Sequence, residues 1–331
     1  MQILVDGDVI AYRCGFAAEK TRYDIYHSAD VEEVIGDDGE KAYKFHDDTV
    51  RVETFDNAKL CKAWLQVQGK EAAAHYTRVP RKEIDDVSHA LHTVKRVMGA
   101  IQAQWPEGDM VAYFSCHTSD NWRTECYPEY KANRKDDRKP FWYDDIRAYM
   151  AVNYDTVEGG CYEADDMISM KAYKLADEME SWVIVSIDKD FLQIAGDHYN
   201  WVKEELVNID STAALQNLAV QRIMGDSVDN IPGCPDIGDV KARAHLFNSE
   251  QPDLESMVME MYYECYEDNN EARWQEALTT AMVTLPEDHD HVNEMMEEVF
   301  NAKQTYEALA KAGGVADDGN GAAPDQPAAD A

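Results

Sequence analysis

The sequence predicts an α/β protein with a mainly parallel sheet, followed by a mostly helical region. Three short apolar runs, Gln2–Val5, Asp109–Phe114 and Ser181–Ile187, have the composition of buried strands. Segments with a helical period lie between these runs along the chain. Buried strands that alternate with helices are typical of an α/β domain, so we expect the three runs to belong to one central sheet.

The first part of the chain contains a predicted insertion. Gly36 to Gly39 form a turn signal between two segments of aromatic and β-branched residues, around Tyr23–Tyr26 and Tyr43–Phe45. This pattern predicts a hairpin insertion within Lys20–Val52. The other elements expected before residue 120 are a strand at Gln2–Val5, helices at Val9–Ala18, Asn57–Gln68 and Ile84–Gln104, and a strand at Asp109–Phe114.

The second part of the chain is predicted to be richer in helices. A stretch with three Gly and two Pro, Gly225–Gly238, separates two of them and is expected to form turns. Gly313–Ala331 is rich in Gly, Ala, Asp and Pro and is expected to be disordered. The elements expected here are helices at Tyr143–Val152 and Glu163–Met179, strands at Ser181–Ile187 and Tyr199–Val202, helices at Thr212–Met224 and Val240–Phe247, and further helices through Leu285 and over Val292–Lys311.

These elements predict three regions. Residues 1–210 should form the α/β core with the hairpin insertion at about 20–52. Residues 211–312 should form the helical region, and residues 313–331 a disordered acidic tail.

Charge is the outlying property of the composition. The chain has 31 Lys and Arg against 65 Asp and Glu, a formal net charge of −34. Half of that charge lies in residues 250–331, which hold 20 acidic and 3 basic residues. The net sign excludes a general polycation that coats nucleic acid. A nucleic-acid role therefore requires locally concentrated basic residues, or metal ions that offset the acids.

The cysteines and the N-terminus indicate the compartment. The seven cysteines are scattered and contain no C-x-x-C, which favours a reducing compartment without a disulfide framework or zinc site. The N-terminus lacks the basic and apolar parts of a signal peptide, and no apolar run is long enough to span a membrane. We expect a cytoplasmic protein.

Acidic residues cluster at strand ends and helix starts. Asp6 and Asp8 follow the first predicted strand, and Asp188 and Asp190 follow the third. Parallel strands bring their carboxyl ends to one edge, where sites form. Any one of these pairs could instead be a solvated turn or a helix cap. If they converge together with Glu163, Asp165, Asp166, Asp226 and Asp229, their repulsion calls for hard divalent cations, Mg²⁺ or Mn²⁺.

Two further segments have a binding character. Asn121–Lys139 holds six basic and four acidic residues, interleaved with Trp122, Tyr127 and Tyr130. Basic side chains contact phosphates and aromatic rings stack on bases, although a solvated loop anchored by its aromatics has the same composition. Gly225–Ala242 resembles a helix–turn–helix connection that could hold a phosphate backbone, or a plain helix hairpin.

Five blocks of the sequence together resemble the 5′-nuclease family, and look closest to bacteriophage 5′–3′ exonucleases. The blocks are VDGD at 5–8, PEYKANR at 128–134, EADD at 163–166, SIDKDF at 186–191 and GDSVDNIPG at 225–233. The resemblance spans Met1–Phe247 and implies a PIN-like fold, with a twisted sheet, helices on both faces and a helical arch at about 121–150. It also implies a helix–three-turn–helix DNA-binding element at about 212–248, often with a K⁺ ion.

The resemblance assigns a role to each matching residue. Lys131 and Arg134 would engage the scissile phosphate, and Tyr130 would stack on the terminal nucleotide. Gly233 and Gly238 would shape the DNA-gripping turns. DNA contacts are also implied for Arg123, Lys135 and Lys241. The implied ligands of two Mg²⁺ ions, with Mn²⁺ as a substitute, are Asp6, Glu163, Asp165, Asp166, Asp188, Asp190, Asp226 and Asp229.

The chain departs from the family at two positions. Ser115 and Cys116 occupy the place of an Asp that usually follows the second strand, and either Asp8 or Asp120 could compensate. Val240 replaces a usual basic residue, and Lys241 could substitute.

The implied function is a metal-dependent 5′–3′ exonuclease and 5′-flap endonuclease in DNA replication, primer removal or recombination. The expected partners are DNA ends, flaps and duplex, with an RNA–DNA hybrid as another substrate. A catalytically weak or silent structure-specific DNA-binding protein is the alternative.

Overall fold

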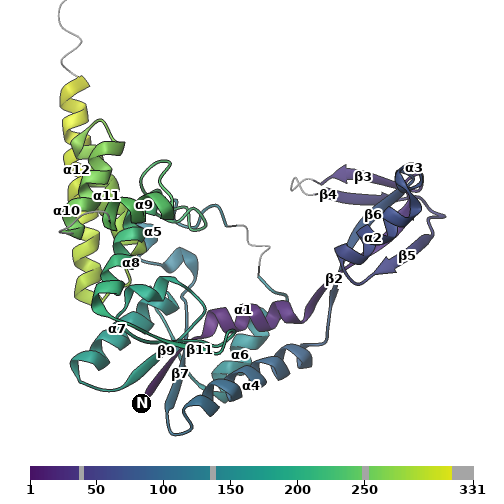
Figure 1. Cartoon of the computed structure of the whole chain (residues 1–331), viewed down its shortest axis with the longest axis horizontal. Helices are drawn as coiled ribbons and strands as arrows, with labels where there is room; N and C mark the ends of the chain where they lie inside the picture. The colour runs from purple at the N-terminus through teal and green to yellow at the C-terminus, as the bar shows by residue number, and fades with distance from the viewer. Residues whose placement is uncertain (37–40, 135–138, 248–252, 315–331) are drawn as a thin grey trace, which may run out of the picture. The chain divides into compact units, whose positions relative to one another are not determined.

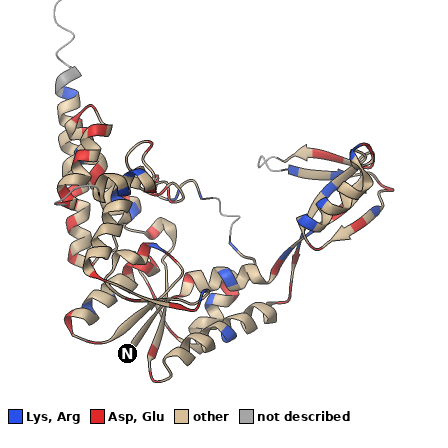
Figure 2. Cartoon of the chain, viewed as in Figure 1, with Lys and Arg blue, Asp and Glu red and all other residues tan. Residues whose placement is uncertain are grey.

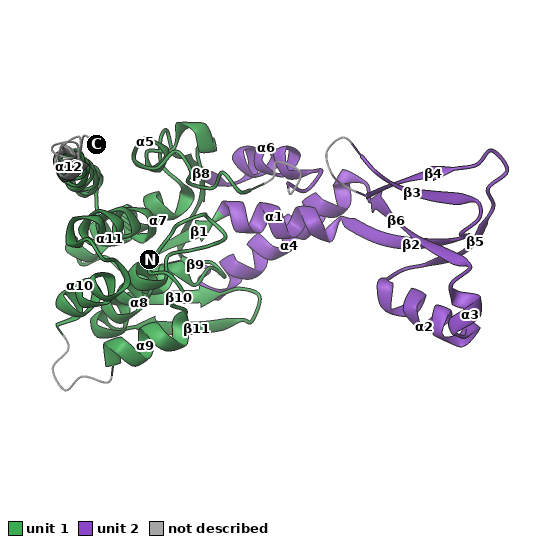
Figure 3. Cartoon of the chain, turned by 90° about the horizontal axis from the view of Figure 1, so that it is seen from above, with its two compact units in different colours: residues 1–6, 107–137, 156–331 green, residues 7–106, 138–155 purple. Residues whose placement is uncertain are grey.

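The computed structural model describes residues 1–36, 41–134, 139–247 and 253–314 (Figure 1). The chain divides into two compact units, which Figure 3 colours separately. The first unit comprises residues 1–6, 107–137 and 156–331, and the second comprises residues 7–106 and 138–155. The expected division near residue 210 stays a prediction.

The first unit is built on the central sheet. Its strands follow the order β11-β10-β9-β1-β7-β8. β1 lies parallel to both β7 and β9, and β9 lies parallel to β10, whereas β11 is antiparallel to β10. The mainly parallel sheet predicted from the sequence is therefore confirmed. The strand bounds are β1 Gln2–Asp6, β7 Asp109–Phe114, β8 Asp155–Glu158, β9 Trp182–Val185, β10 Gly196–Asn200 and β11 Glu205–Ile209.

Helices cover this sheet because the middle of its central strand β1 is apolar. Consecutive residues Ile3, Leu4 and Val5 are fully buried, which means that both faces of β1 are covered. On one face, α7 (Ala164–Asp177) packs against β1, β7 and β9. Ile168 of α7 lies in the same apolar cluster as Leu4.

A helical region completes the first unit. Its helices α8 to α12 appear in order along the chain, as predicted, and Figure 2 shows that acidic residues predominate on α12. The short α5 (Arg123–Cys126) packs against α11 and α12. α12 ends at Gly314, and the rest of the predicted tail lies outside the described residues. The bounds are α8 Ser211–Met224, α9 Asp239–Phe247, α10 Leu254–Cys265, α11 Asn269–Val283 and α12 His289–Gly314, with short 3-10 turns η1 Thr118–Asp120 and η3 Asp190–Gln193.

The second unit combines a helical cluster with a small β module. Helices α1, α4 and α6 pack on one another. β2 pairs antiparallel with β5 on one side and β6 on the other, and β3 pairs with β4. The bounds are α1 Gly7–Ala17, α2 Ala58–Gln68, α3 Lys70–Ala73, α4 Val87–Gln104, α6 Tyr143–Asn153, β2 Glu19–His27, β3 Val31–Ile35, β4 Lys41–Phe45, β5 Arg51–Phe55 and β6 Tyr76–Ile84.

The β module extends beyond the predicted hairpin. Tyr23–Tyr26 and Tyr43–Phe45 both lie in strands, but they do not pair with each other, because β4 pairs antiparallel with β3 within residues 20–52. β2 instead pairs with β5 and β6, and Trp64 of α2 packs against Phe55 and Tyr76 of those two strands. The strands that pair with β2 therefore extend to Ile84, and the bounds of the insertion stay a prediction.

The expected arch at about 121–150 stays a prediction. It includes α5 in the first unit and α6 in the second, and residues 135–138 are outside the described ranges. Across the described ranges, no helix is both long and apolar enough to cross a membrane.

Candidate active site

The carboxyl edge of the sheet holds the first group of predicted acids. Asp6 ends β1 and is 6% exposed. Ser186 Oγ, just after β9, donates to Asp6 Oδ2 at 2.8 Å and accepts the Asp188 N–H at 3.0 Å. The Asp190 N–H in turn donates to Asp188 Oδ1 at 3.0 Å. A chain of hydrogen bonds thus connects the acids that follow β1 and β9, as the parallel-strand argument predicts.

The N-terminus of α7 holds the second group. Glu163 is the N-cap, and its backbone N–H donates to Asp166 Oδ2 at 3.1 Å in a reciprocal capping box. The Ala164 N–H donates to Ser115 Oγ at 2.9 Å, so Ser115 occupies another free N–H of this helix end. The EADD block therefore sets the helix start as well as presenting carboxylates.

Arg123 lies in the interior, not on a DNA-facing surface. Its side chain is 2% exposed, and both of its Nη atoms donate to the fully buried Asp166 at 2.8 Å. Its Nε donates to Met282 O at 3.0 Å, and Nη2 donates to Thr284 O at 3.2 Å. This position does not support the predicted direct DNA contact by Arg123, because the cation is engaged by a buried carboxylate. By the same geometry, Asp166 is engaged by Arg123 and does not face solvent.

Glu163 is held by a second cation. Lys131 Nζ donates to Glu163 Oε1, and Tyr130 OH donates to Oε2 at 2.7 Å. Burial opposes ionisation of Glu163, but the charges of Lys131 and Arg123 outweigh it and lower the pKa of Glu163 to about 2. Lys131 adopts a φ of 57°, a left-handed conformation that non-glycine residues hold only where the surroundings enforce it.

Tyr130 does not offer a free ring for stacking. It is 4% exposed and packs in the cluster of Trp122 and Met282. Lys131 Nζ lies 4.8 Å from the ring centroid. The predicted stacking of Tyr130 on a nucleotide is therefore not supported by its position, because the ring faces the interior and the hydroxyl faces Glu163.

The turn segment after α8 docks onto the basic segment. The Lys131 N–H donates to Asp229 O at 2.8 Å, and Asn230 Nδ2 donates to Glu129 O at 2.7 Å. Arg134 Nη2 pairs with Asp229 Oδ1, and Lys131 Nζ lies 3.6 Å from Asp229 Oδ2. The blocks PEYKANR and GDSVDNIPG, about 100 residues apart, thus form one interface.

A cavity of about 120 Å³ opens where these segments meet. Burial and the charges of Glu163 and Asp166 raise the pKa of Asp165 above its ordinary value. Burial, followed by the neighbouring Asp188, raises the pKa of Asp190 to about 6. The charged side chains that line the cavity include Asp165, Asp190, Asp226, Asp229 and Lys189.

The acids do not form a ready-made metal site. In the ranges that the structure describes, no group of three or more His, Cys, Asp or Glu side chains has the arrangement to hold a metal ion. Carboxylates are nevertheless the donors that Mg²⁺ and Mn²⁺ prefer, and burial together with neighbouring carboxylates raises the pKa of Asp165 and of Asp190. The donor set thus fits such ions in chemistry, although the carboxylates would have to move to bind them.

The helix–three-turn–helix residues differ in what their positions require. Gly233 has a φ of +63°, and a Cβ there would lie 2.3 Å from the Met224 backbone. Gly238 has open space around it, so no steric reason in this structure demands glycine. Lys241 Nζ donates to Asp236 O at 2.9 Å on an exposed surface. Lys135 lies outside the described residues.

The two acids named as compensating for the missing second-strand Asp have hydrogen-bond partners of their own. Asp8 belongs to the second unit, where its Oδ1 accepts from Tyr143 OH at 2.6 Å. Asp120 lies in η1 and accepts from Ser119 Oγ at 3.1 Å. Burial and the nearby charge of Glu163 raise the pKa of the Cys116 thiol to about 11, so Cys116 stays neutral beside the site.

Two glutamines that contact the site acids were not predicted from the sequence. Gln221 Nε2 on α8 donates to Asp190 Oδ1 at 2.6 Å, and Gln193 Nε2 donates to Gln221 Oε1 at 2.9 Å. Nothing in the local sequence marks them, because a neutral amide in a helix has no spacing rule of its own.

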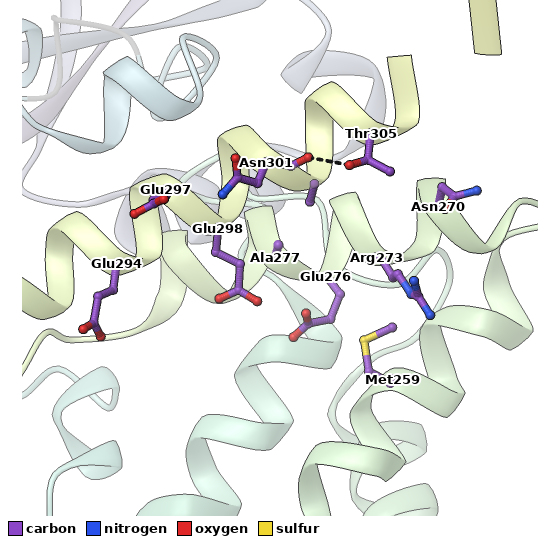
Figure 4. A pocket seen from close by; sticks show the side chains of 11 residues that line it. Met259, Asn270, Arg273, Glu276, Ala277, Glu294, Glu297, Glu298, Asn301 and Thr305 are labelled. Carbon is purple, nitrogen blue, oxygen red and sulfur yellow. Dashed lines mark hydrogen bonds between the residues drawn. The ribbon is translucent and has the colours of Figure 1, made fainter. Parts of the chain in front are cut away.

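A second cavity, of about 590 Å³, lies between α10, α11 and α12 (Figure 4). Glu294, Glu297 and Glu298 of α12 line it together with Arg273 and Met259. Glu276 also lines it but is held by Arg222 at 2.6 Å. None of the predicted site residues lines this cavity. Its lining instead includes several of the acidic side chains of the C-terminal region.

Comparison with known proteins identifies relatives. Residues 72–223 match the family model described as 5′-3′ exonuclease, N-terminal resolvase-like domain. The chain is 27% identical over 187 residues to the flap endonuclease Xni of Vibrio atlanticus, covering 53% of this chain and 72% of that protein. Over 175 residues it is 29% identical to the Vibrio cholerae protein of the same name, and the match covers 49% of this chain and 68% of that protein.

Solved structures are also similar in part. The T5 D15 protein co-crystallised with metal ions matches with a TM-score of 0.46 and 15% identity, over 64% of this chain and 90% of that one. The catalytic core of Rad2 in complex with DNA matches with a TM-score of 0.37 and 13% identity, over 67% and 85%. The sequence matches confirm the predicted resemblance to a nuclease family.

Proposed function

We propose, on the premise that this chain resembles the 5′-nucleases, that it hydrolyses phosphodiester bonds near DNA 5′ ends with the help of divalent metal ions. It would act as a 5′–3′ exonuclease and 5′-flap endonuclease. The observation that carries the proposal is the cavity where Asp165 of α7, Asp190 of η3 and Asp226 after α8 meet beside Lys131 and Arg134. Three segments that the family resemblance singled out separately thus meet in one place.

The proposed metal ligands fall into two groups. Asp6, Asp165, Asp188, Asp190 and Asp226 would hold two Mg²⁺ or Mn²⁺ ions directly. Glu163, Asp166 and Asp229, which Lys131, Arg123 and Arg134 already engage, would support them. Ions bound there would lower the pKa of a bound water and stabilise the departing 3′-oxygen. A K⁺ ion at the turns between α8 and α9 is part of the proposal on the resemblance alone.

The protein's own residues would supply charge and position. Lys131 and Arg134 lie on either side of Asp229, and their positive charges would counter the charge that develops on the phosphate. Lys131 is fixed by its contacts to Glu163 and to the Asp229 backbone, so it needs little reorganisation to act. Gly233 keeps the turn close to α8 and would hold that turn against the DNA backbone.

The proposed substrate is DNA with a free 5′ end, a flap or a duplex end, and an RNA–DNA hybrid shares the same chemistry. The proposed process is DNA replication, primer removal or recombination. The curated relatives described above come from Vibrio, so an origin in a bacteriophage stays a prediction.

A cleavage assay tests the proposal. A duplex labelled separately at each 5′ and 3′ end, and a 5′-flap substrate, are incubated with the protein in Mg²⁺. We expect short products from the 5′ end and none in EDTA. The double variant Asp188→Ala, Asp190→Ala should bind the flap but not cut it. Binding without cutting by the wild-type protein in both Mg²⁺ and Mn²⁺ would instead identify a silent structure-specific DNA-binding protein.

The matched control is Asp109→Asn. Asp109 is an exposed acid at the start of β7, the opposite end of the sheet from Asp6, and it accepts only from Gln2 Nε2 at 3.2 Å among the contacts described. The Asp109→Asn variant should leave cleavage unchanged. Equal loss in this control would show that the assay reports on fold or net charge.

A further inference from the structure

The end of α11 and the start of its connection to α12 contact the side chains that hold both acidic groups of the candidate site. This segment comprises Met282 and Val283, the last two residues of α11, followed by the extended C-cap Thr284 (φ −74°, ψ 130°) and Leu285. Met282 O and Thr284 O accept from Arg123. Val283 O and the Leu285 N–H engage Gln193 at 3.0 and 2.9 Å.

The Gln193 amide has every polar atom in use. Its Oε1 accepts from the Leu285 N–H, and its Nε2 donates to both Val283 O and Gln221 Oε1. A backbone N–H can only donate, so Leu285 decides which end of the Gln193 amide is the oxygen. Gln193 is 7% exposed, and water does not compete freely for these bonds.

The orientation of the Gln193 amide determines which atom of Gln221 faces Asp190. Because Gln221 Oε1 accepts from Gln193, the Gln221 Nε2 is left to face Asp190 Oδ1, at 2.6 Å. The backbone of Leu285 thereby ensures that a donor, not an oxygen, meets the carboxylate. On the other side of the same segment, Arg123 uses its remaining N–H groups to hold Asp166.

We propose that Met282–Leu285 is a two-sided strap that positions the reactive acids, and that Gln193 and Gln221 are positioning residues for the proposed nuclease reaction. One side of the strap fixes Arg123 and, through Asp166, the start of α7. The other side fixes Asp190 through two amides. The inference rests on the proposed function, and it gives the C-terminal region a role in catalysis, although Met282–Leu285 lies outside the family match over residues 72–223.

The variant Gln193→Glu tests the strap with almost no change in shape. One of its oxygens can still accept from Leu285, but the other has no proton for Val283 O or Gln221 Oε1. Gln221 must then turn its amide and present its oxygen to Asp190. We expect kcat for flap cleavage to fall about 10- to 100-fold, the usual effect of losing a group that orients a ligand, with KM for DNA unchanged.

A second variant and a control protect the test against a simple loss of stability. Gln221→Met keeps the length of the side chain but removes the donor to Asp190, and should lower kcat in the same way. Asn217→Ala is the matched control. Asn217 lies one turn earlier on α8 and donates to Leu192 O at 2.9 Å, so its loss weakens the same helix contact without touching the amide chain. We expect wild-type kcat in this control.

Direct Mn²⁺ binding separates the strap from the proposed function. Free Mn²⁺ is followed by its paramagnetic signal during titration of the full chain, with Asp188→Ala, Asp190→Ala defining the site. Gln193→Glu should weaken binding there about 10- to 100-fold, and Asn217→Ala should not. If the wild-type protein does not cleave DNA, the proposed function fails while this binding result still decides on the strap. Mn²⁺ affinity and kcat in Gln193→Glu equal to those of the control, or a change in KM alone, would overturn the inference.

Discussion

Two carboxylates two residues apart, Glu163 and Asp165, have opposite surroundings. Both belong to the start of α7 and both are shielded from water. Lys131, Tyr130 and Arg123 converge on Glu163, and its pKa falls to about 2. Asp165 faces the cavity that Asp190 and Asp226 also line, and its pKa rises. Burial acts in the same direction on both, so the partners decide the outcome.

The difference divides the site into two halves. In the cation-held half, Lys131 pairs with Glu163, Arg123 pairs with Asp166 and Arg134 pairs with Asp229. In the cavity-facing half, burial and the neighbouring carboxylates oppose the ionisation of Asp165 and Asp190 and raise the pKa of each. A protein that tolerates such repulsion beside a well-neutralised cluster is poised to accept an external cation.

The largest expected effect comes from removing the most buried cation. Arg123→Met should lower the free energy of unfolding by about 3–5 kcal/mol, because it leaves the Asp166 carboxylate buried and unpaired. Urea denaturation in EDTA measures the loss. Arg243→Met is the control, since its pair with Asp239 on α9 is exposed and should be worth under about 0.5 kcal/mol. Similar losses of unfolding free energy in both variants would contradict the expectation that the buried ion pair matters more than the exposed one.

Lys131→Met should remove the cation that connects Glu163 to Asp229 within the cation-held half. We expect single-turnover cleavage of a 5′-flap to slow about 10²- to 10³-fold, the scale of removing one preorganised group that stabilises a transition state. DNA binding in EDTA should change far less. Lys303→Met on α12, where the ammonium lies 5.7 Å from the Trp274 ring centroid, removes the same charge away from the site. An equal slowing in that control would point to net charge alone.

The two halves should respond oppositely to pH. The pKa of Asp190 rises from 3.8 to about 6, so its ionisation on folding is unfavourable, and stability falls as pH rises between about 4 and 6. The pKa of Glu163 falls to about 2, so its contribution is present above about pH 4.5 and is lost as pH falls from there. In EDTA at pH 7, Asp190→Asn should therefore be more stable than wild type, by at most about 3 kcal/mol.

Urea denaturation at pH 2, 4 and 7 checks both signs. Glu163→Gln should be less stable than wild type at pH 7, and the difference in the free energy of unfolding should shrink as the pH falls from about 4.5 to about 2. An Asp190→Asn variant that is no more stable than wild type at pH 7 would mean that Asp190 is not under repulsion.

The smallest effect is expected at the exposed edge of the cation-held half. Arg134 pairs with Asp229 but its side chain is 48% exposed. Arg134→Gln should change the free energy of unfolding by about 0–1 kcal/mol, and 1 M NaCl should erase the difference. A loss as large as that of Arg123→Met would contradict the ranking by burial.

The strands were predictable from the sequence because they are buried on both faces. The runs ILV, MVAYF and WVIV leave no alternative to a central sheet, and their ends place Asp6 and Asp188. β6 was not predicted. It contains Pro80 among charged residues, and a proline is tolerated there because β6 is at the edge of its sheet.

The candidate site was predictable as a set of acids but not as a set of contacts. Arg123 stands in a basic segment and has the composition of a DNA contact, but its partner Asp166 is 43 residues away. Only the fold shows that this cation is internal. Nothing in the sequence predicted a role for Gln193 or Gln221. Their orientation depends on a hydrogen bond from Leu285, which lies 92 residues after Gln193.

The late position of the Met282–Leu285 segment in the chain has a consequence for folding during translation. A growing chain that has emerged only as far as α9 already carries every acid of the candidate site. It lacks the carbonyls that hold Arg123 and the N–H that orients Gln193. Because domains fold from the N-terminus during translation, the proposed nuclease activity would be the last property that the chain acquires. A partly made protein would then be harmless to nucleic acids around the ribosome.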